Sequence, residues 1–218
     1  MTAPKYLTKS RFKLGSECPA KLFFTRKPEY ADQKGSDSFM AALAQGGYQV
    51  GELAKLYHPG GHDIKSLDYE DSLAETKKLM EQENVIIYEA AFKHENLFIR
   101  ADVVVKKGNC VDLIEVKAKS CDPSELPFEK KRAEWKPYLE DVAFQKYVMR
   151  KALPGHRISA HLMLADKTAL CPTDGLNQKF LIKEKDNGNK EVEVSAEITE
   201  ADLNPKLLCQ LPVNEHCE

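Results

Sequence analysis

The sequence lacks an apolar run long enough to cross a membrane, and it lacks a recognisable secretion signal. None of its hydrophobic stretches approaches the roughly 20 residues that a membrane helix needs. Residues 1–11 are basic but contain no apolar core, so they do not resemble a signal peptide. We therefore expect no membrane association and a cytoplasmic location.

The six cysteines include no Cys-X-X-Cys pair, so a zinc ribbon is not expected. A net charge of −2 also gives little sign of a nucleic-acid-binding protein. The charges are nevertheless unevenly distributed, because residues 1–30 are mainly basic and residues 191–218 mainly acidic. This asymmetry indicates one surface that attracts phosphates and one that repels them, although two ordinary solvated faces explain it equally well.

A chain of 218 residues with 42% hydrophobic and 30% charged residues is typical of a globular protein. No internal repeat or low-complexity segment interrupts it. We expect a single domain over 1–218, with N-terminal helices at 6–30, a core at about 35–165 and a C-terminal extension at 166–218.

The residue pattern predicts helices first, then a β-meander, then a helix and a further strand, which is typical of a mixed α/β domain. Thr8 or Ser10 is expected to cap a first helix and Pro19 to begin a second. Further helices are expected at 37–57 with an interruption at Gly46-Gly47, at 68–83, at 135–151 and at 197–207. Strands are expected at 85–93, 97–106, 110–118 and 157–165, with a hairpin at 180–182 and 191–194.

The chemistry concentrates in the segment from Ile99 to Lys119. Side chains alternate along a strand, so Glu115 and Lys117 share one face. A two-residue turn at Gly108-Asn109 would place Asp102 opposite Glu115, with Cβ atoms about 4.5–5.5 Å apart. A three-residue loop would instead send Asp102 to the other face.

Two adjacent carboxylates repel each other unless a cation lies between them. Mg2+ and Mn2+ prefer oxygen ligands and polarise phosphodiesters, so this pair predicts a hydrolytic metal site. Lys117 would position the attacking water or stabilise charge in the transition state. Surface ion pairs across neighbouring strands are the alternative. Apolar residues surround these three side chains in the sequence, however, which favours a buried functional site.

The segment resembles the core of the PD-(D/E)XK nucleases, with Asp102 as the first acid and Glu115-Val116-Lys117 as the second motif. The helix containing Gln145 resembles that of the RecB-like exonuclease branch, except that Tyr147 follows two residues later rather than four. The resemblance implies a restriction-endonuclease-like α/β fold, in which helices flank a mixed central sheet. It also implies that Gln145 assists the catalytic residues.

In that family a further metal ligand comes from a helix before the sheet, a position that Glu52 resembles; Glu89 is the rival from a neighbouring strand. The opening segment with Cys18-Pro19 also resembles RecB-like enzymes that hold an iron–sulfur cluster. Here the remaining ligands would be Cys171, Cys209 and Cys217, whose spacing departs from the family's tight trio and disfavours a cluster.

The resemblance therefore implies a Mg2+- or Mn2+-dependent nuclease acting on DNA rather than RNA, in repair, recombination or defence. The basic N-terminal helices and Lys130-Lys131-Arg132 would hold the backbone phosphates. Two alternatives stay open: a non-catalytic nucleic-acid-binding module on the same fold, and an interaction domain whose strand charges are surface ion pairs.

Overall fold

A computed structural model describes residues 6–25, 27–30, 38–125, 128, 132–184 and 190–217. Its centre is a mixed sheet in the order β2-β3-β4-β5-β6-β9, with β1 pairing to β4 outside this path. The strands are β1 (Leu7–Thr8), β2 (His62–Asp63), β3 (Asn84–His94), β4 (Leu97–Lys107), β5 (Cys110–Cys121), β6 (Arg157–Asp166) and β9 (Leu208–Pro212). A separate hairpin consists of β7 (Phe180–Glu184) and β8 (Lys190–Val194).

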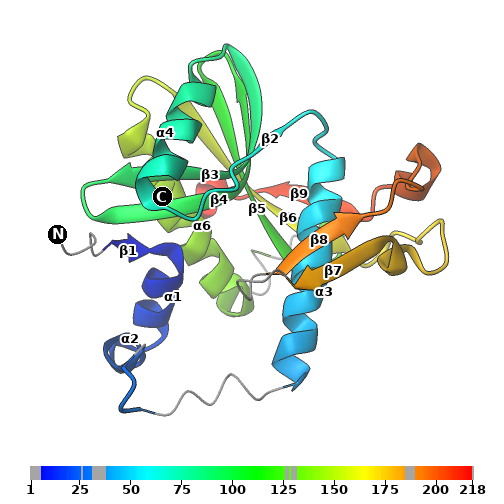
Figure 1. The fold of residues 1–218 in the computed structure, drawn as a ribbon, viewed down its shortest axis with the longest axis horizontal. Helices are drawn as coiled ribbons and strands as arrows, with labels where there is room; N and C mark the ends of the chain where they lie inside the picture. Colours follow the sequence, from blue (N-terminus) through cyan, green and yellow to red (C-terminus); the bar gives the residue numbers. More distant parts are fainter. Residues whose placement is uncertain are drawn as a thin grey trace.

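Helices lie on both sides of this sheet (Figure 1). They are α1 (Lys9–Glu17), α2 (Pro19–Phe24), α3 (Ser38–Leu56), α4 (Tyr69–Met80) and α6 (Arg132–Ala152), and short 3-10 turns include η2 (Pro123–Glu125), η3 (Leu176–Lys179), η4 (Glu200–Leu203) and η5 (Asn214–His216). The predicted fold class, an α/β domain with a mixed central sheet flanked by helices, is confirmed and is consistent with the restriction-endonuclease-like architecture. Among the residues described, no helix is both long and apolar enough to span a bilayer.

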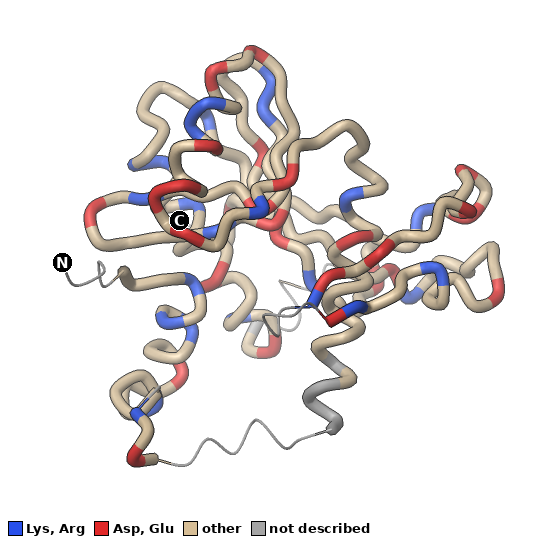
Figure 2. The backbone as a smooth tube through the Cα atoms, in the orientation of Figure 1, with Lys and Arg blue, Asp and Glu red and all other residues tan. Residues whose placement is uncertain are grey.

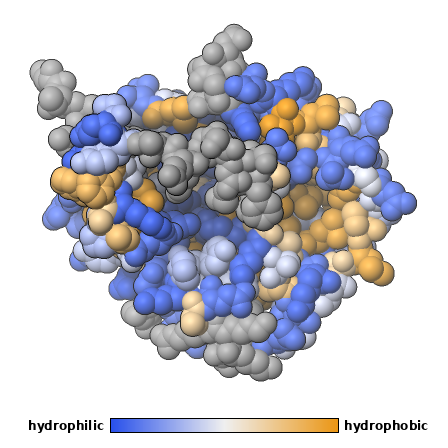
Figure 3. Space-filling model, turned by 90° about the horizontal axis from the view of Figure 1, so that it is seen from below, coloured by the Kyte–Doolittle hydropathy of each residue, from blue (hydrophilic) through white to orange (hydrophobic). Residues whose placement is uncertain are grey.

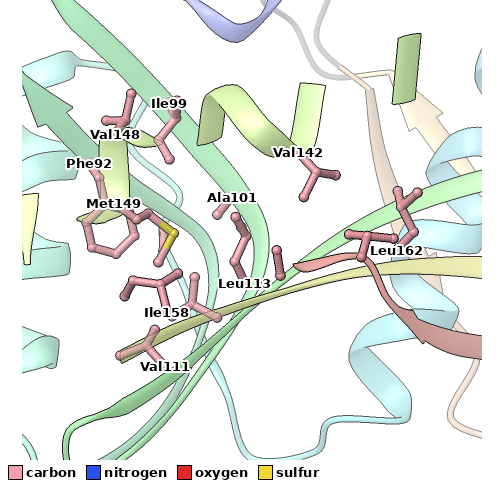
Figure 4. Close-up of a cluster of buried hydrophobic side chains, with 14 of the residues drawn as sticks. Phe92, Ile99, Ala101, Val111, Leu113, Val142, Val148, Met149, Ile158 and Leu162 are labelled. Atoms are coloured by element: carbon pink, nitrogen blue, oxygen red, sulfur yellow. The ribbon is translucent and has the colours of Figure 1, made fainter. Parts of the chain in front are cut away.

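Two apolar layers hold the sheet between its helices. Beneath α6, the larger layer joins side chains such as Val142 and Met149 to Leu113 of β5 and Ile158 of β6 (Figure 4). On the opposite face, Leu53 of α3 packs with residues of β3 to β6 and of the C-terminal segment. Because each face is covered, the central strands are apolar on both sides, and a charged side chain among them is costly without a partner.

The local signals at the N-terminus are confirmed. Thr8 caps α1 by accepting a hydrogen bond from the backbone N–H of Arg11, and Pro19 begins α2. The predicted interruption at Gly46-Gly47 is wrong, since α3 runs through both glycines. A single glycine weakens a helix by only about 1 kcal/mol, which tertiary packing offsets.

The C-terminal prediction is also wrong in part. The helix expected at 197–207 is reduced to η4, and β9 follows it at the edge of the sheet. β9 pairs antiparallel with β6 from Ala165↔Leu208 to His161↔Pro212. A strand of five residues that ends in proline gives little periodic signal, and pairing with β6 stabilises it.

Candidate active site

The hairpin between β4 and β5 has the predicted two-residue turn. Lys107 pairs with Cys110, and the same register continues to Val103↔Ile114. Gly108 adopts φ +56°, a conformation that glycine reaches without strain. The turn therefore brings Asp102 next to Glu115, as the sequence predicts.

Asp102 lies where the regular pairing of β4 with β5 stops. Its Oδ2 atom accepts a hydrogen bond of 2.8 Å from the backbone N–H of Val116. The Asp102 side chain thus takes the place of a backbone carbonyl as the acceptor for this N–H. On the neighbouring strand, Glu115 is fully buried, with 0% of its side chain exposed. The hairpin thus holds two neighbouring carboxylates where the regular pairing stops, one bonded to the backbone and one fully buried.

Lys9, the first residue of α1, joins the two carboxylates. Its Nζ atom lies 3.2 Å from Oδ1 of Asp102 and 3.1 Å from both carboxylate oxygens of Glu115. In Figure 2, α1 has basic positions and the adjoining strands have acidic ones. Lys9 was not among the predicted site residues, because contact between residue 9 and residue 102 cannot be read from local patterns.

Lys117 lies between Glu115 and a third acid from α6. Its Nζ atom contacts Oε1 of Glu115 and lies 3.3 Å from Oδ2 of Asp141. Asp141, also 0% exposed, was missed as a site residue, although it stands four residues before Gln145 and so on the same helix face. That spacing is the signal that could have found it.

Gln145, which the resemblance expected to assist the catalytic residues, bonds to two of the acids. Its Nε2 atom donates to Oε2 of Glu115 at 2.9 Å and to Oδ1 of Asp141 at 3.2 Å. Gln145 is fully buried, so these bonds fix the orientation of both carboxylates. Tyr147, by contrast, is exposed and gives no support for a role in the site.

The electrostatics of this cluster keep Glu115 ionised and Lys117 protonated. Burial alone would raise the pKa of Glu115, but the ammonium groups of Lys9 and Lys117 outweigh it and hold the pKa well below its usual range. Burial and the charge of Glu115 raise the pKa of Asp102 to about 7. Burial would lower the pKa of Lys117, yet the carboxylates around it, Glu115 foremost, raise it above its ordinary value.

A cleft of about 410 Å3 opens beside Asp102 and Lys117, with α3 forming the opposite wall. The end of the molecule seen from below has a recessed, largely hydrophilic area near its middle (Figure 3). Glu52 and Glu89 both line this cleft, as does Tyr48. The cleft therefore has charged side chains along its walls, and it borders the candidate catalytic residues.

The carboxylates of Glu52 and Glu89 are engaged with other partners. Glu52 pairs with Lys55 at 2.8 Å, and Glu89 pairs with Arg100 at 3.3 Å. Glu89 has a φ of +55°, which interrupts the regular conformation of β3, and the Glu89–Asp102 pair is absent from the β3–β4 register. A positive φ at a glutamate is rare and leaves no sequence signal.

The donor set of Asp102 and Glu115 fits a hard divalent cation. Three carboxylate oxygens converge on one position, now taken by the Lys9 ammonium. Mg2+ is commonly bound through one or two carboxylates together with water and substrate phosphate. Among the described residues, however, no set of three or more His, Cys, Asp or Glu side chains is grouped to hold a metal, so Glu52 and Glu89 do not complete a shell.

The cysteines named for an iron–sulfur cluster make separate contacts. Cys18 links α1 and α2, Cys171 donates to the carbonyl of Thr173, and Cys217 lies 3.9 Å from the carbonyl of Leu139. Cys209 contacts Cys121 at 3.4 Å instead. Within the described ranges the four do not form a metal-binding group. Of the basic run Lys130-Lys131-Arg132, the side chains lie outside the described residues.

No family model matches the sequence, and no curated protein matches it. Among solved structures, the chain is similar to an alkaline exonuclease from Laribacter hongkongensis, with 13% sequence identity and a TM-score of 0.35. The match covers 96% of this chain and 78% of that chain. Neither sequence comparison supports the RecB-like branch, and so distant a structural likeness says nothing about the site.

Proposed function

We propose that this chain is a metal-dependent nuclease that hydrolyses the phosphodiester bonds of DNA. The observation that carries the proposal is the convergence of Asp102 and Glu115 on one cation position, with Lys117 beside them at the edge of a cleft. A cross-strand ion pair serving stability alone needs neither a third acid nor an adjoining cleft.

Asp102 and Glu115 would hold Mg2+ or Mn2+. When bound, such an ion polarises the phosphodiester and favours ionisation of a water molecule. Gln145 would keep Glu115 oriented through its 2.9 Å hydrogen bond, and the Val116 N–H would do the same for Asp102. These bonds fix the two carboxylates before any ligand arrives, which reduces the cost of ordering them on binding.

Lys117 would act as a hydrogen-bond donor rather than as a base. Glu115 and Asp141 raise its pKa and keep its ammonium protonated at neutral pH. A charged donor at the cleft edge can orient the attacking water and stabilise the negative charge that develops on the phosphate. Asp141 would then act as a positioning residue for Lys117.

The test is cleavage of single- and double-stranded DNA, and of RNA, by the full chain with Mg2+, Mn2+ or a chelator. Lys117→Ala should lower the cleavage rate by at least about 100-fold, the typical effect of removing a transition-state donor. Lys119→Ala is the matched control, because Lys119 lies two residues along the same strand and pairs with Glu134.

Metal-dependent cleavage that survives in Lys119→Ala and is lost in Lys117→Ala supports the proposal. Cleavage by Lys117→Ala at the wild-type rate would place the activity elsewhere. Nucleic-acid binding without cleavage under any metal would favour the non-catalytic module instead.

A further inference from the structure

The ammonium of Lys9 occupies the position on which Asp102 and Glu115 converge. It lies within 3.2 Å of Asp102 and 3.1 Å of Glu115. The side chain is 22% exposed, so it occupies the site without being sealed off from solvent. The protein's own lysine ammonium therefore already occupies the position that a bound cation would take.

The cluster is close to charge balance with Lys9 in place. Its acids are Asp102, Glu115 and Asp141, and its cations are Lys9, Lys117 and, at 3.9 Å from Asp141, Lys13. A divalent ion added to this set would leave a surplus of positive charge in a largely buried place. Like charges a few ångströms apart repel strongly where water is scarce, so Lys9 and the ion exclude each other.

The backbone that carries Lys9 is firmly anchored. The ring of Phe12 stacks on Phe144 of α6, with centroids 4.4 Å apart, and Thr8 pairs with Phe98 of β4. Because α1 is held at both points, exchange of Lys9 for a metal requires rotation of a long, flexible side chain rather than removal of the helix. Because the side chain is partly exposed, the displaced ammonium can turn towards solvent.

Building on the proposed function, we propose that Lys9 is a resident counter-ion of the metal site and that a divalent metal binds by displacing its ammonium. Metal uptake in this chain is therefore a competition for Asp102 and Glu115. The lysine stabilises the metal-free fold and at the same time weakens metal affinity.

The test is the affinity of the full, chelator-treated protein for Mn2+, measured by isothermal titration calorimetry. Lys9→Met keeps the length and apolar stem of the side chain but removes the competing charge, so Mn2+ should bind at least about tenfold more tightly. Lys21→Met, on α2, removes an equal charge that pairs with Glu17 outside the cluster, and should change affinity by less than about threefold. Lys9→Arg keeps the charge and should give no gain.

Thermal melting with and without Mn2+ controls for a folding defect in Lys9→Met. Without Lys9 the two carboxylates lack their cation, so added Mn2+ should raise the melting temperature of Lys9→Met, and of Lys9→Gln, more than that of the wild type. Equal Mn2+ affinity in wild type, Lys9→Met and Lys9→Gln would overturn the inference. If Asp102→Asn abolished Mn2+ binding in the same series, the metal site itself would stand. If no variant and no wild-type sample bound Mn2+, both proposals would fail together.

Discussion

Two buried carboxylates in this molecule, Asp202 and Glu115, are each surrounded by lysine and hydrogen-bond donors, but they differ in how many other charged groups lie around them. Asp202, in the C-terminal segment, accepts from Lys179 at 3.0 Å through both oxygens and from the Thr173 hydroxyl at 2.6 Å. The backbone N–H of Thr199 adds a further bond of 2.8 Å. A single lysine and nearby hydrogen-bond donors therefore satisfy this carboxylate completely, and their evident role is to fix η4 in place.

The cluster around Glu115 contains more charged groups and is not fully hydrogen-bonded. It brings three acids and several lysines from four separate elements to one point, and Oε1 of the buried Gln145 finds no hydrogen-bond partner within the described residues. Asp102 and Lys117 of this cluster also border the cleft. A single buried ion pair can thus be explained by folding alone, whereas several buried acids and lysines beside open space call for a ligand.

The largest expected effect on stability is that of Glu115→Ala in the metal-free protein. Removing one partner of a buried ion pair typically lowers the free energy of unfolding by 3–5 kcal/mol. We expect a loss of about 3 kcal/mol here, because Lys9 stays paired with Asp102 and Lys117 stays paired with Asp141. Asp202→Ala should cost less, since Lys179 is 25% exposed and can turn towards water. Urea unfolding followed by circular dichroism measures both free energies of unfolding. A larger loss in Asp202→Ala would reverse the comparison.

A smaller effect concerns acid stability. Hydrogen bonds from Thr173 and from the Thr199 backbone, together with Lys179, hold the pKa of Asp202 well below its ordinary value of 3.8. Because the folded-state pKa is the lower one, this stabilisation is present above the unfolded-state pKa and is lost as the pH falls towards the folded-state pKa.

Asp202→Asn should therefore melt at a lower temperature than the wild type near neutral pH, and the gap should narrow between about pH 5 and pH 3. Thermal melts across that range measure the gap. A gap that stays constant with pH would show that Asp202 stabilises the fold by packing rather than by charge.

Much of the site could be predicted from the sequence because it depends on local rules. Alternation along β4 and β5 and the turn at Gly108-Asn109 fix the register, and the register alone brings Asp102 to Glu115. Gln145 was expected because its helix resembles that of the RecB-like branch. Each of these inferences spans a single hairpin or a single helix.

The remaining features depend on long-range contact or on unusual backbone geometry. Lys9 reaches Glu115 across 106 positions of sequence, and no periodicity links the two. Glu89 adopts a left-handed conformation without a glycine to mark it. Such features arise from the assembled fold, so a single sequence gives no signal for them.

The central claim is that Asp102 and Glu115 are preset to hold a divalent metal. A crystal structure of the full chain soaked with Mn2+, with the ion located by its anomalous scattering, tests it most directly. We predict one Mn2+ bonded to both carboxylates at about 2.0–2.3 Å, with the Lys9 ammonium moved away from them towards solvent. An ion bound elsewhere, or no ion while Lys9 stays between the two carboxylates at saturating Mn2+, would contradict it.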